Sequence, residues 1–217
     1  MDDLSGIQRF TVWVLPVLFA ITVHEVAHGW VALRLGDRTA QMMGRLTLNP
    51  IKHIDPVGTV LVPGFLLLMG GFVFGWAKPV PVTWENLRNP RRDVALVAVA
   101  GPAANLLMAI LWSIILKIGL LLSTTTDSWA YPLVLMGNAG ILINLVLMVL
   151  NLLPILPLDG GRILSAFLPP PMAYKLSRLE PWGFFIILGL FFLGLLSMVI
   201  NPAVQTLHAI MLRTISL

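Results

Sequence analysis

Residues 10–35 read FTVWVLPVLFAITVHEVAHGWVALRL, an apolar stretch long enough to cross a bilayer that nevertheless contains His24, Glu25 and His28. Histidines four positions apart lie on one face of a helix, where both imidazoles can bind one zinc ion. Glu25 lies about 100° around the helix, where it can take a proton from a water that the metal activates. Polar groups at membrane depth are costly and tend to mark function. The alternative is a buried polar network without metal.

Composition places the whole chain in a membrane. Its 217 residues are 58% hydrophobic and 11% charged, with a mean hydropathy of +0.90, whereas soluble domains are about 25% charged. We expect a single domain over residues 1–217. The absence of cysteine excludes disulfides, thiolate ligands and cysteine nucleophiles. The net charge of +4 comes from Lys and Arg spread over short loops, which indicates membrane topology rather than nucleic-acid binding.

Four segments satisfy the length of about 20 apolar residues that a spanning helix needs, namely 10–35, 94–122, 133–158 and 182–200. A fifth, 57–77, is interrupted by glycine and proline, and we expect it to enter the membrane and return. Residues 45–48 (Arg45, Leu46, Thr47 and Leu48) alternate polar and apolar side chains, which is typical of an edge strand that could pair with an unwound substrate. A plain loop is the alternative there. The predicted fold class is an all-α polytopic membrane protein with about four full transmembrane helices, a re-entrant segment and a short membrane-associated β element.

Charge supports the return of segment 57–77. If it returns, Arg9, Lys117 and Arg213 lie on one face and the other 11 of the 14 Lys and Arg residues lie on the opposite face. The positive-inside rule identifies that basic face as cytoplasmic. A full crossing would leave no clear inside, and it would also separate Asp159 from the two histidines.

The third zinc ligand is predicted to be Asp159, because catalytic zinc typically has three protein ligands and one open position. His53, His208 and the other carboxylates are weaker candidates, and His208 falls in a predicted amphipathic tail at the opposite face. Asp159 ends the stretch NLLPILPLDGG at residues 151–161, where two prolines disrupt the helix and two glycines permit close approach. The alternative role for Asp159 is an N-cap of the following helix.

These residues resemble the site-2 protease family of intramembrane zinc metalloproteases, in the compact form without PDZ or CBS domains. The resemblance rests on the order of three elements, which are the histidine pair with Glu25, GPAAN at residues 101–105 and the 151–161 stretch. It implies that Asp159 is a metal ligand and that Asn151 helps to hold the substrate carbonyl or its oxyanion. It also places Asn105 near the site as a substrate-binding residue; the alternative is an asparagine that packs helices.

The expected function is therefore hydrolysis of peptide bonds within or next to transmembrane segments of membrane proteins, with one Zn²⁺ per chain. Glu25 would be the general base, and the substrate helix would have to unwind locally. We expect a multi-pass protein of the cell membrane with its active site toward the cytoplasm, regulated by a separate protein if at all. The alternatives are a divalent-metal transporter, which would need ligands at several depths and usually an internal repeat, and a catalytically inactive member of the same fold.

Overall fold

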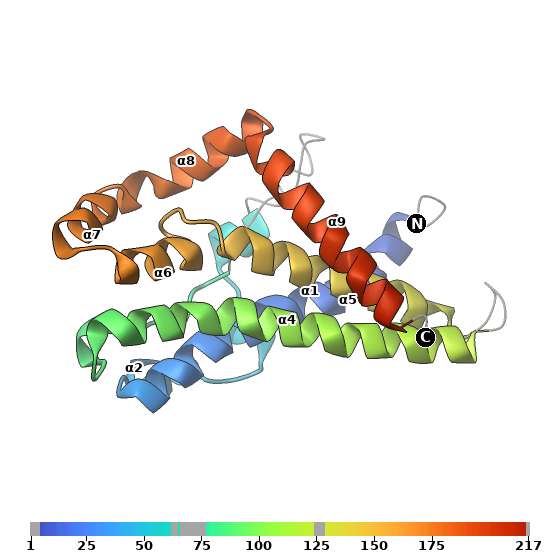
Figure 1. Cartoon of the computed structure of the whole chain (residues 1–217). Coiled ribbons are helices and arrows are strands. Elements are labelled where there is room, and N and C mark those ends of the chain that lie inside the picture. The colour runs from blue at the N-terminus through green and yellow to red at the C-terminus, as the bar shows by residue number, and fades with distance from the viewer. Residues whose placement is uncertain (1–4, 62–64, 66–76, 124–128, 216–217) are drawn as a thin grey trace.

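The computed structural model describes the chain except residues 1–4, 62–64, 66–76, 124–128 and 216–217 (Figure 1). Within the described residues, every regular element is helical, and four helices are long and apolar enough to cross a membrane. This confirms the predicted all-α polytopic class. The four are α1 (Gly6–Leu35), α4 (Pro90–Leu122), α5 (Tyr131–Asn151) and α9 (Leu195–Ile215). The shorter elements are α2 (Thr39–Met42), η1 (Pro50–His53), η2 (Pro56–Leu61), η3 (Trp84–Asn86), α6 (Asp159–Phe167), α7 (Pro170–Ser177) and α8 (Glu180–Phe192).

Local sequence signals set both ends of α1. Ser5 caps the first turn, because its side chain accepts a hydrogen bond from Gln8 N while the Gln8 side chain accepts one from Ser5 N. At the other end, Gly36 has a φ of 119°, which ends the helix in a conformation that other residues rarely adopt. The histidine pair therefore lies in the second half of an uninterrupted helix of 30 residues.

Helices α1, α4 and α5 run side by side and form the centre of the bundle, with α9 crossing over them (Figure 1). Trp112 and Leu116 of α4 pack with Ile141 and Leu145 of α5, and Val204 of α9 completes this cluster. Burial in a membrane does not by itself favour helix association, so close packing of this kind holds the bundle together. The result is a rigid frame on which the polar residues of α1, α4 and α5 face one another.

The fourth predicted span, residues 182–200, is wrong. The chain breaks there into α8 and α9, and Gly194 between them has a φ of 73°, a left-handed conformation that suits glycine. The long helix is α9, which carries His208 into the bundle, where His208 Nε2 lies 2.9 Å from Asn138 Oδ1. The prediction failed because the polar residues of α9 made a membrane-length helix look like an amphipathic tail.

The predicted β element is not confirmed. Residues 45–49 have no regular secondary structure. Instead of a backbone ladder, the Arg45 side chain ties this stretch to a later one, by hydrogen bonds to Lys78 O at 2.9 Å and Pro79 O at 3.4 Å. Pairing of residues 45–48 with an unwound substrate stays a prediction.

Most of the predicted re-entrant segment, 57–77, lies outside the described residues, but the residues that flank it are described. Lys78 N donates a hydrogen bond to His53 O at 2.9 Å, so the chain comes back to the place it left. A full crossing would have separated these two residues by roughly the 30 Å of the hydrocarbon core. The flanking residues agree with a return, and the path between them stays a prediction.

Residues 78–88 follow this segment, and we call them the return segment. A buried carboxylate holds the return segment in place. Asp37, which follows α1 and is 1% exposed, accepts hydrogen bonds from Thr39 N at 3.0 Å, Thr83 N at 2.9 Å and Asn86 Nδ2 at 3.1 Å. Burial acts to raise the pKa of Asp37, but the hydrogen bonds outweigh burial and hold that pKa below its usual value. The return segment is thus tied to the end of the helix that carries both histidines.

Candidate metal centre

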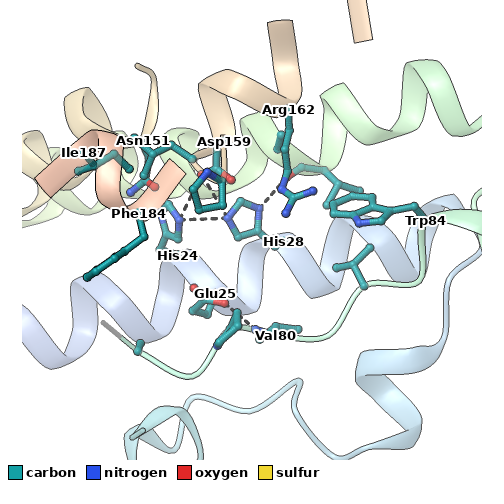
Figure 2. Close-up of a pocket in the computed structure, with 17 residues that line it drawn as sticks. His24, Glu25, His28, Val80, Trp84, Asn151, Asp159, Arg162, Phe184 and Ile187 are labelled. Carbon is teal, nitrogen blue, oxygen red and sulfur yellow. Dashed lines mark hydrogen bonds and ion pairs between the residues drawn. The ribbon is translucent and has the colours of Figure 1, made fainter. Parts of the chain in front are cut away.

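The structure brings the three predicted ligands together. His24 and His28 project from α1, and Asp159 is the first residue of α6 (Figure 2). The Nε2 atoms of the two histidines are 3.0 Å apart, and each lies 3.4 Å from Asp159 Oδ2. The three side chains are largely shielded from solvent, so they form a compact cluster of ligand atoms inside the protein.

The second nitrogen of each imidazole is already occupied. His28 Nδ1 lies 2.7 Å from Val97 O, and a carbonyl oxygen only accepts, so His28 Nδ1 carries the hydrogen. His24 Nδ1 lies 2.6 Å from the side-chain oxygen of Asn105 and donates to it. A neutral imidazole has one hydrogen, so both Nε2 atoms present lone pairs toward Asp159.

This arrangement fits a divalent cation. Asp159 Oδ2 is buried and has no hydrogen-bond partner, so three acceptors face one another without a donor, which is costly in a shielded site. Gly101 of α4 leaves room beside them, because a Cβ there would lie 2.6 Å from His24 Nε2 and closer still to His28 Nε2. Two imidazoles and a carboxylate are a ligand set of catalytic zinc sites, which keep a fourth position open.

The chain turns sharply to deliver Asp159. Helix α5 ends at Asn151 rather than at residue 158, and residues 152–158, which include Pro154 and Pro157, form an irregular connection to α6. Proline cannot continue the hydrogen-bond pattern of α5, which explains the early end. Leu158 occupies the N-cap position of α6, so the capping role considered for Asp159 is not observed.

Glu25 lies beside the histidine pair and points toward the return segment (Figure 2). Its Oε2 accepts a hydrogen bond from Val80 N at 2.7 Å, and the side chain is half-buried. Val80 stands between Pro79 and Pro81, which have no backbone N–H, so it is the one backbone donor of that triplet. The return segment therefore orients the carboxylate that was predicted to be the general base.

A cavity of about 720 Å³ adjoins the metal centre. Asn151, at the last residue of α5, faces this cavity; its Nδ2 donates to Leu147 O at 2.9 Å and carries a second hydrogen that can serve another acceptor. The walls come from α1, the return segment and the residue before it, α4, the end of α5, the α5–α6 connection, α6 and α8. They include His24, Glu25, His28, Ala77, Pro79, Val80, Val82, Trp84, Val97, Ala98, Asn151, Pro157, Leu158, Asp159, Arg162, Phe184 and Ile187.

The residues predicted to bind substrate lie elsewhere. Arg45, Leu46, Thr47 and Leu48 are not among the residues that line this cavity, and Asn105 is not either. Asn105 is fully buried behind His24, with its side-chain oxygen directed at the imidazole. These five residues are therefore not part of the cavity wall; their contact with a substrate stays a prediction, and the position of Asn105 indicates a different role.

Two residues near the centre were missed by the sequence analysis. Asn144 of α5 is 0% exposed and accepts a hydrogen bond from Asn105 at 2.9 Å; an amide within an apolar helix was a signal that could have found it. Arg162 lines the cavity, pairs with Glu180 at 2.9 Å and lies 5.0 Å from the centre of the Trp84 ring. Its partners come from distant parts of the chain, so no local pattern predicted them.

Comparisons with known proteins agree with this geometry. The sequence profile of Peptidase family M50 matches residues 12–130. A Bacillus subtilis protein named "Putative zinc metalloprotease YwhC" is 40% identical over 197 residues, which cover 87% of this chain and 84% of that protein. The Mycolicibacterium smegmatis protein named "Putative zinc metalloprotease Rip2" is 33% identical over 191 residues, covering 86% and 69%. Stage IV sporulation protein FB of Bacillus subtilis is 25% identical over 181 residues, covering 81% and 58%. No solved structure matches this chain.

Proposed function

This chain belongs to Peptidase family M50, the site-2 protease family of intramembrane zinc metalloproteases, and we propose that it hydrolyses peptide bonds within or next to transmembrane segments of other membrane proteins. The observation that carries the proposal is the convergence of Asp159 of α6 on His24 and His28, which lie with Glu25 on a helix long enough to cross a membrane. The described metal-ligating groups gather at one point instead of following a path through the bilayer. The transporter alternative is therefore not favoured.

The polar residues around the metal centre have separate roles in this reaction. His24, His28 and Asp159 would hold a zinc ion, which when bound would supply Lewis-acid chemistry at the scissile carbonyl and lower the pKa of water. Glu25, held in place by Val80 N–H, takes the proton of the attacking water and passes it to the leaving amine. The second Nδ2 hydrogen of Asn151 donates to the oxyanion that develops on the carbonyl.

The substrate must arrive as an opened chain, because a peptide bond within a helix is shielded by the turn around it. The cavity suits an apolar segment, since Phe184 and Ile187 of α8 and Val82 of the return segment form part of its wall. Helix-breaking residues near the cut site would ease the local unwinding, because glycine and proline weaken a helix by about 1 and 3 kcal/mol. We therefore expect cleavage near such residues.

The cavity would open toward the cytoplasm. His28 lies in the half of α1 that leads to α2, and Asp159 begins α6. Helices α2, α6 and α7 lie at the same end of the bundle (Figure 1), and the chain there carries Arg34, Arg38, Arg162 and Lys175. Arg9, Lys117 and Arg213 lie toward the opposite ends of α1, α4 and α9. Excess Lys and Arg mark the cytoplasmic side.

Zinc content and cleavage, measured on the same purified samples, test the proposal. We expect about one zinc per chain by mass spectrometry, lost in His28→Ala and kept in Glu25→Gln. Glu25→Gln should fail to cleave single-pass membrane substrates, because an amide cannot accept the proton. The matched control is Glu85→Gln, an exposed carboxylate on η3, which should keep both zinc and cleavage. Cleavage by Glu25→Gln at the wild-type rate would refute the general-base assignment.

A further inference from the structure

Two buried asparagines connect three helices behind His24. Asn105 of α4 and Asn144 of α5 are both 0% exposed, and their side chains hydrogen bond to each other at 2.9 Å. The same Asn105 reaches His24 of α1 with its oxygen. Buried amides in apolar helices are costly unless each donor and acceptor is satisfied, and here the partners form a continuous chain.

The direction of each hydrogen bond in this chain is fixed by backbone carbonyls, which only accept. Asn144 Nδ2 donates to Gly140 O at 2.8 Å, so Asn144 turns its oxygen toward Asn105. Asn105 Nδ2 therefore donates, both to Asn144 Oδ1 and to Ala20 O at 3.2 Å. Asn105 must then present its oxygen to the imidazole.

From this we propose that Asn144, acting through Asn105, is a positioning residue that sets the tautomer of His24. With an acceptor at 2.6 Å, His24 carries its hydrogen on Nδ1 and presents the Nε2 lone pair to the metal. If the Asn105 amide turned over, its NH₂ group would face Nδ1, which would favour the hydrogen on Nε2 and remove the ligand lone pair. The inference rests on the proposed metal centre and adds to it a residue that touches neither ion nor substrate.

The two histidines are held in different ways, which provides an internal comparison. His28 Nδ1 donates to a backbone oxygen, Val97 O, and no side-chain substitution can take that partner away. The partner of His24 Nδ1 is instead the side chain of Asn105, which is itself oriented by the side chain of Asn144. Replacing Asn144 should therefore disturb the tautomer of His24 and leave the tautomer of His28 unchanged.

The first measurement needs no variant. Nitrogen chemical shifts of ¹⁵N-histidine in the metal-free protein distinguish Nδ1–H from Nε2–H imidazole. We expect His24 to be in the Nδ1–H form, assigned by loss of its signals in His24→Gln. Observation of mainly the Nε2–H form at His24 would overturn the proposal.

The second measurement compares zinc dissociation constants, obtained by competition with a chelator. We expect Asn105→Leu to weaken zinc binding by about 10- to 100-fold, the usual effect of losing an outer-sphere partner. Asn144→Leu should weaken it in the same direction, because Asn105 then loses one of the two acceptors that orient it. If both act through the same amide, the double variant should bind no more weakly than Asn105→Leu alone.

Asn138→Leu is the matched control. Asn138 also lies on α5 and its amide also contacts a histidine side chain, that of His208, but it is not part of this chain of hydrogen bonds. Zinc affinity should be unchanged in this variant. Equal weakening in Asn138→Leu and Asn144→Leu would show a general loss of packing, and wild-type affinity in Asn144→Leu would also overturn the proposal. If His28→Ala retained zinc as well, the metal centre itself would have failed rather than the positioning role.

Discussion

At the scale of single residues, the candidate metal centre depends on a glycine, Gly101, as much as on the three candidate ligands. Gly101 brings α4 against the Nε2 edges of both imidazoles, and a Cβ there would lie too close to the Nε2 atoms of His24 and His28. The methyl group could not move aside, because it is attached directly to the backbone of a long packed helix. Gly101 thus keeps the coordination space open.

Gly101→Ala should therefore lose zinc while the bundle stays folded. Alanine favours helix over glycine by about 1 kcal/mol, so secondary structure should be retained and the defect confined to the centre. Zinc content and circular dichroism of the purified variant would be measured together. Gly189→Ala is the control, since a Cβ on Gly189 of α8 meets nothing within 4 Å. Full zinc occupancy in Gly101→Ala would show that the ion binds elsewhere.

The cluster of candidate ligands could be predicted from sequence because the information was local. His24 and His28 lie one turn apart on a single helix, and Asp159 stands in a stretch whose prolines and glycines mark a break at membrane depth. Asn144 and Val80 were not predicted, because their importance comes from contacts with Asn105 and Glu25, which lie far away along the chain. The spacing of residues cannot reveal a hydrogen bond between helices whose relative rotation is still unknown.

At the scale of elements, the return segment orients Glu25 and forms part of the cavity wall. It supplies the backbone N–H that orients Glu25, and Asp37 fastens it to the end of α1. This connection could not be predicted from the sequence, because an acid in a polar loop between two apolar spans is ordinarily solvated. The break between α8 and α9 was missed for a similar reason, since hydropathy measures composition and does not detect a single left-handed glycine.

Stability should depend on pH through Asp37. Its pKa is lowered in the folded state, so the ionised carboxylate stabilises the fold above the ordinary aspartate pKa of about 3.9. That contribution is lost as the pH falls through the lower pKa of the folded state. Asp37→Asn should cost about 1.5–3 kcal/mol at neutral pH, the range for hydrogen bonds to a charged group.

The check is thermal unfolding of both proteins in detergent from pH 7 to pH 3. The difference in melting temperature between wild type and Asp37→Asn should be constant near neutrality and should shrink as the pH falls below about 4. Glu85→Gln, which alters an exposed carboxylate, should have the melting temperature of the wild type at every pH in this range. A difference of the same size at every pH would mean that Asp37 acts through packing and not through its charge.

At the scale of the whole molecule, the class and the number of spanning helices could be predicted from composition and hydropathy. The boundaries of the first two spans were close as well, because α1 and α4 are continuous apolar helices. Where the chain doubles back, hydropathy is ambiguous. The hydrogen bond between His53 O and Lys78 N brings the two ends of the doubtful segment together, which is information that only the fold contains.

Cysteine labelling would test this topology directly, and the chain has no native cysteine to interfere. Single cysteines replacing Lys52 and Lys78 should both react with a membrane-impermeant maleimide from the cytoplasmic side. A cysteine replacing Trp129, which is 78% exposed between α4 and α5, should react only from the other side. Labelling of positions 52 and 78 from opposite sides would refute the return of segment 57–77.

The shortness of α8 has a consequence for the lipid around the protein. Its 13 residues extend about 20 Å, whereas the hydrocarbon core of a bilayer is about 30 Å thick. Lipids next to a hydrophobic element that is too short adjust by thinning. Phe184 and Ile187 place α8 at the wall of the cavity, so an α8 that lies across the bilayer would bring this hydrophobic mismatch beside the metal centre. A locally thinned bilayer would shorten the path along which bulk water reaches a hydrolytic reaction, and it would favour the approach of client helices that are themselves too short for the surrounding membrane.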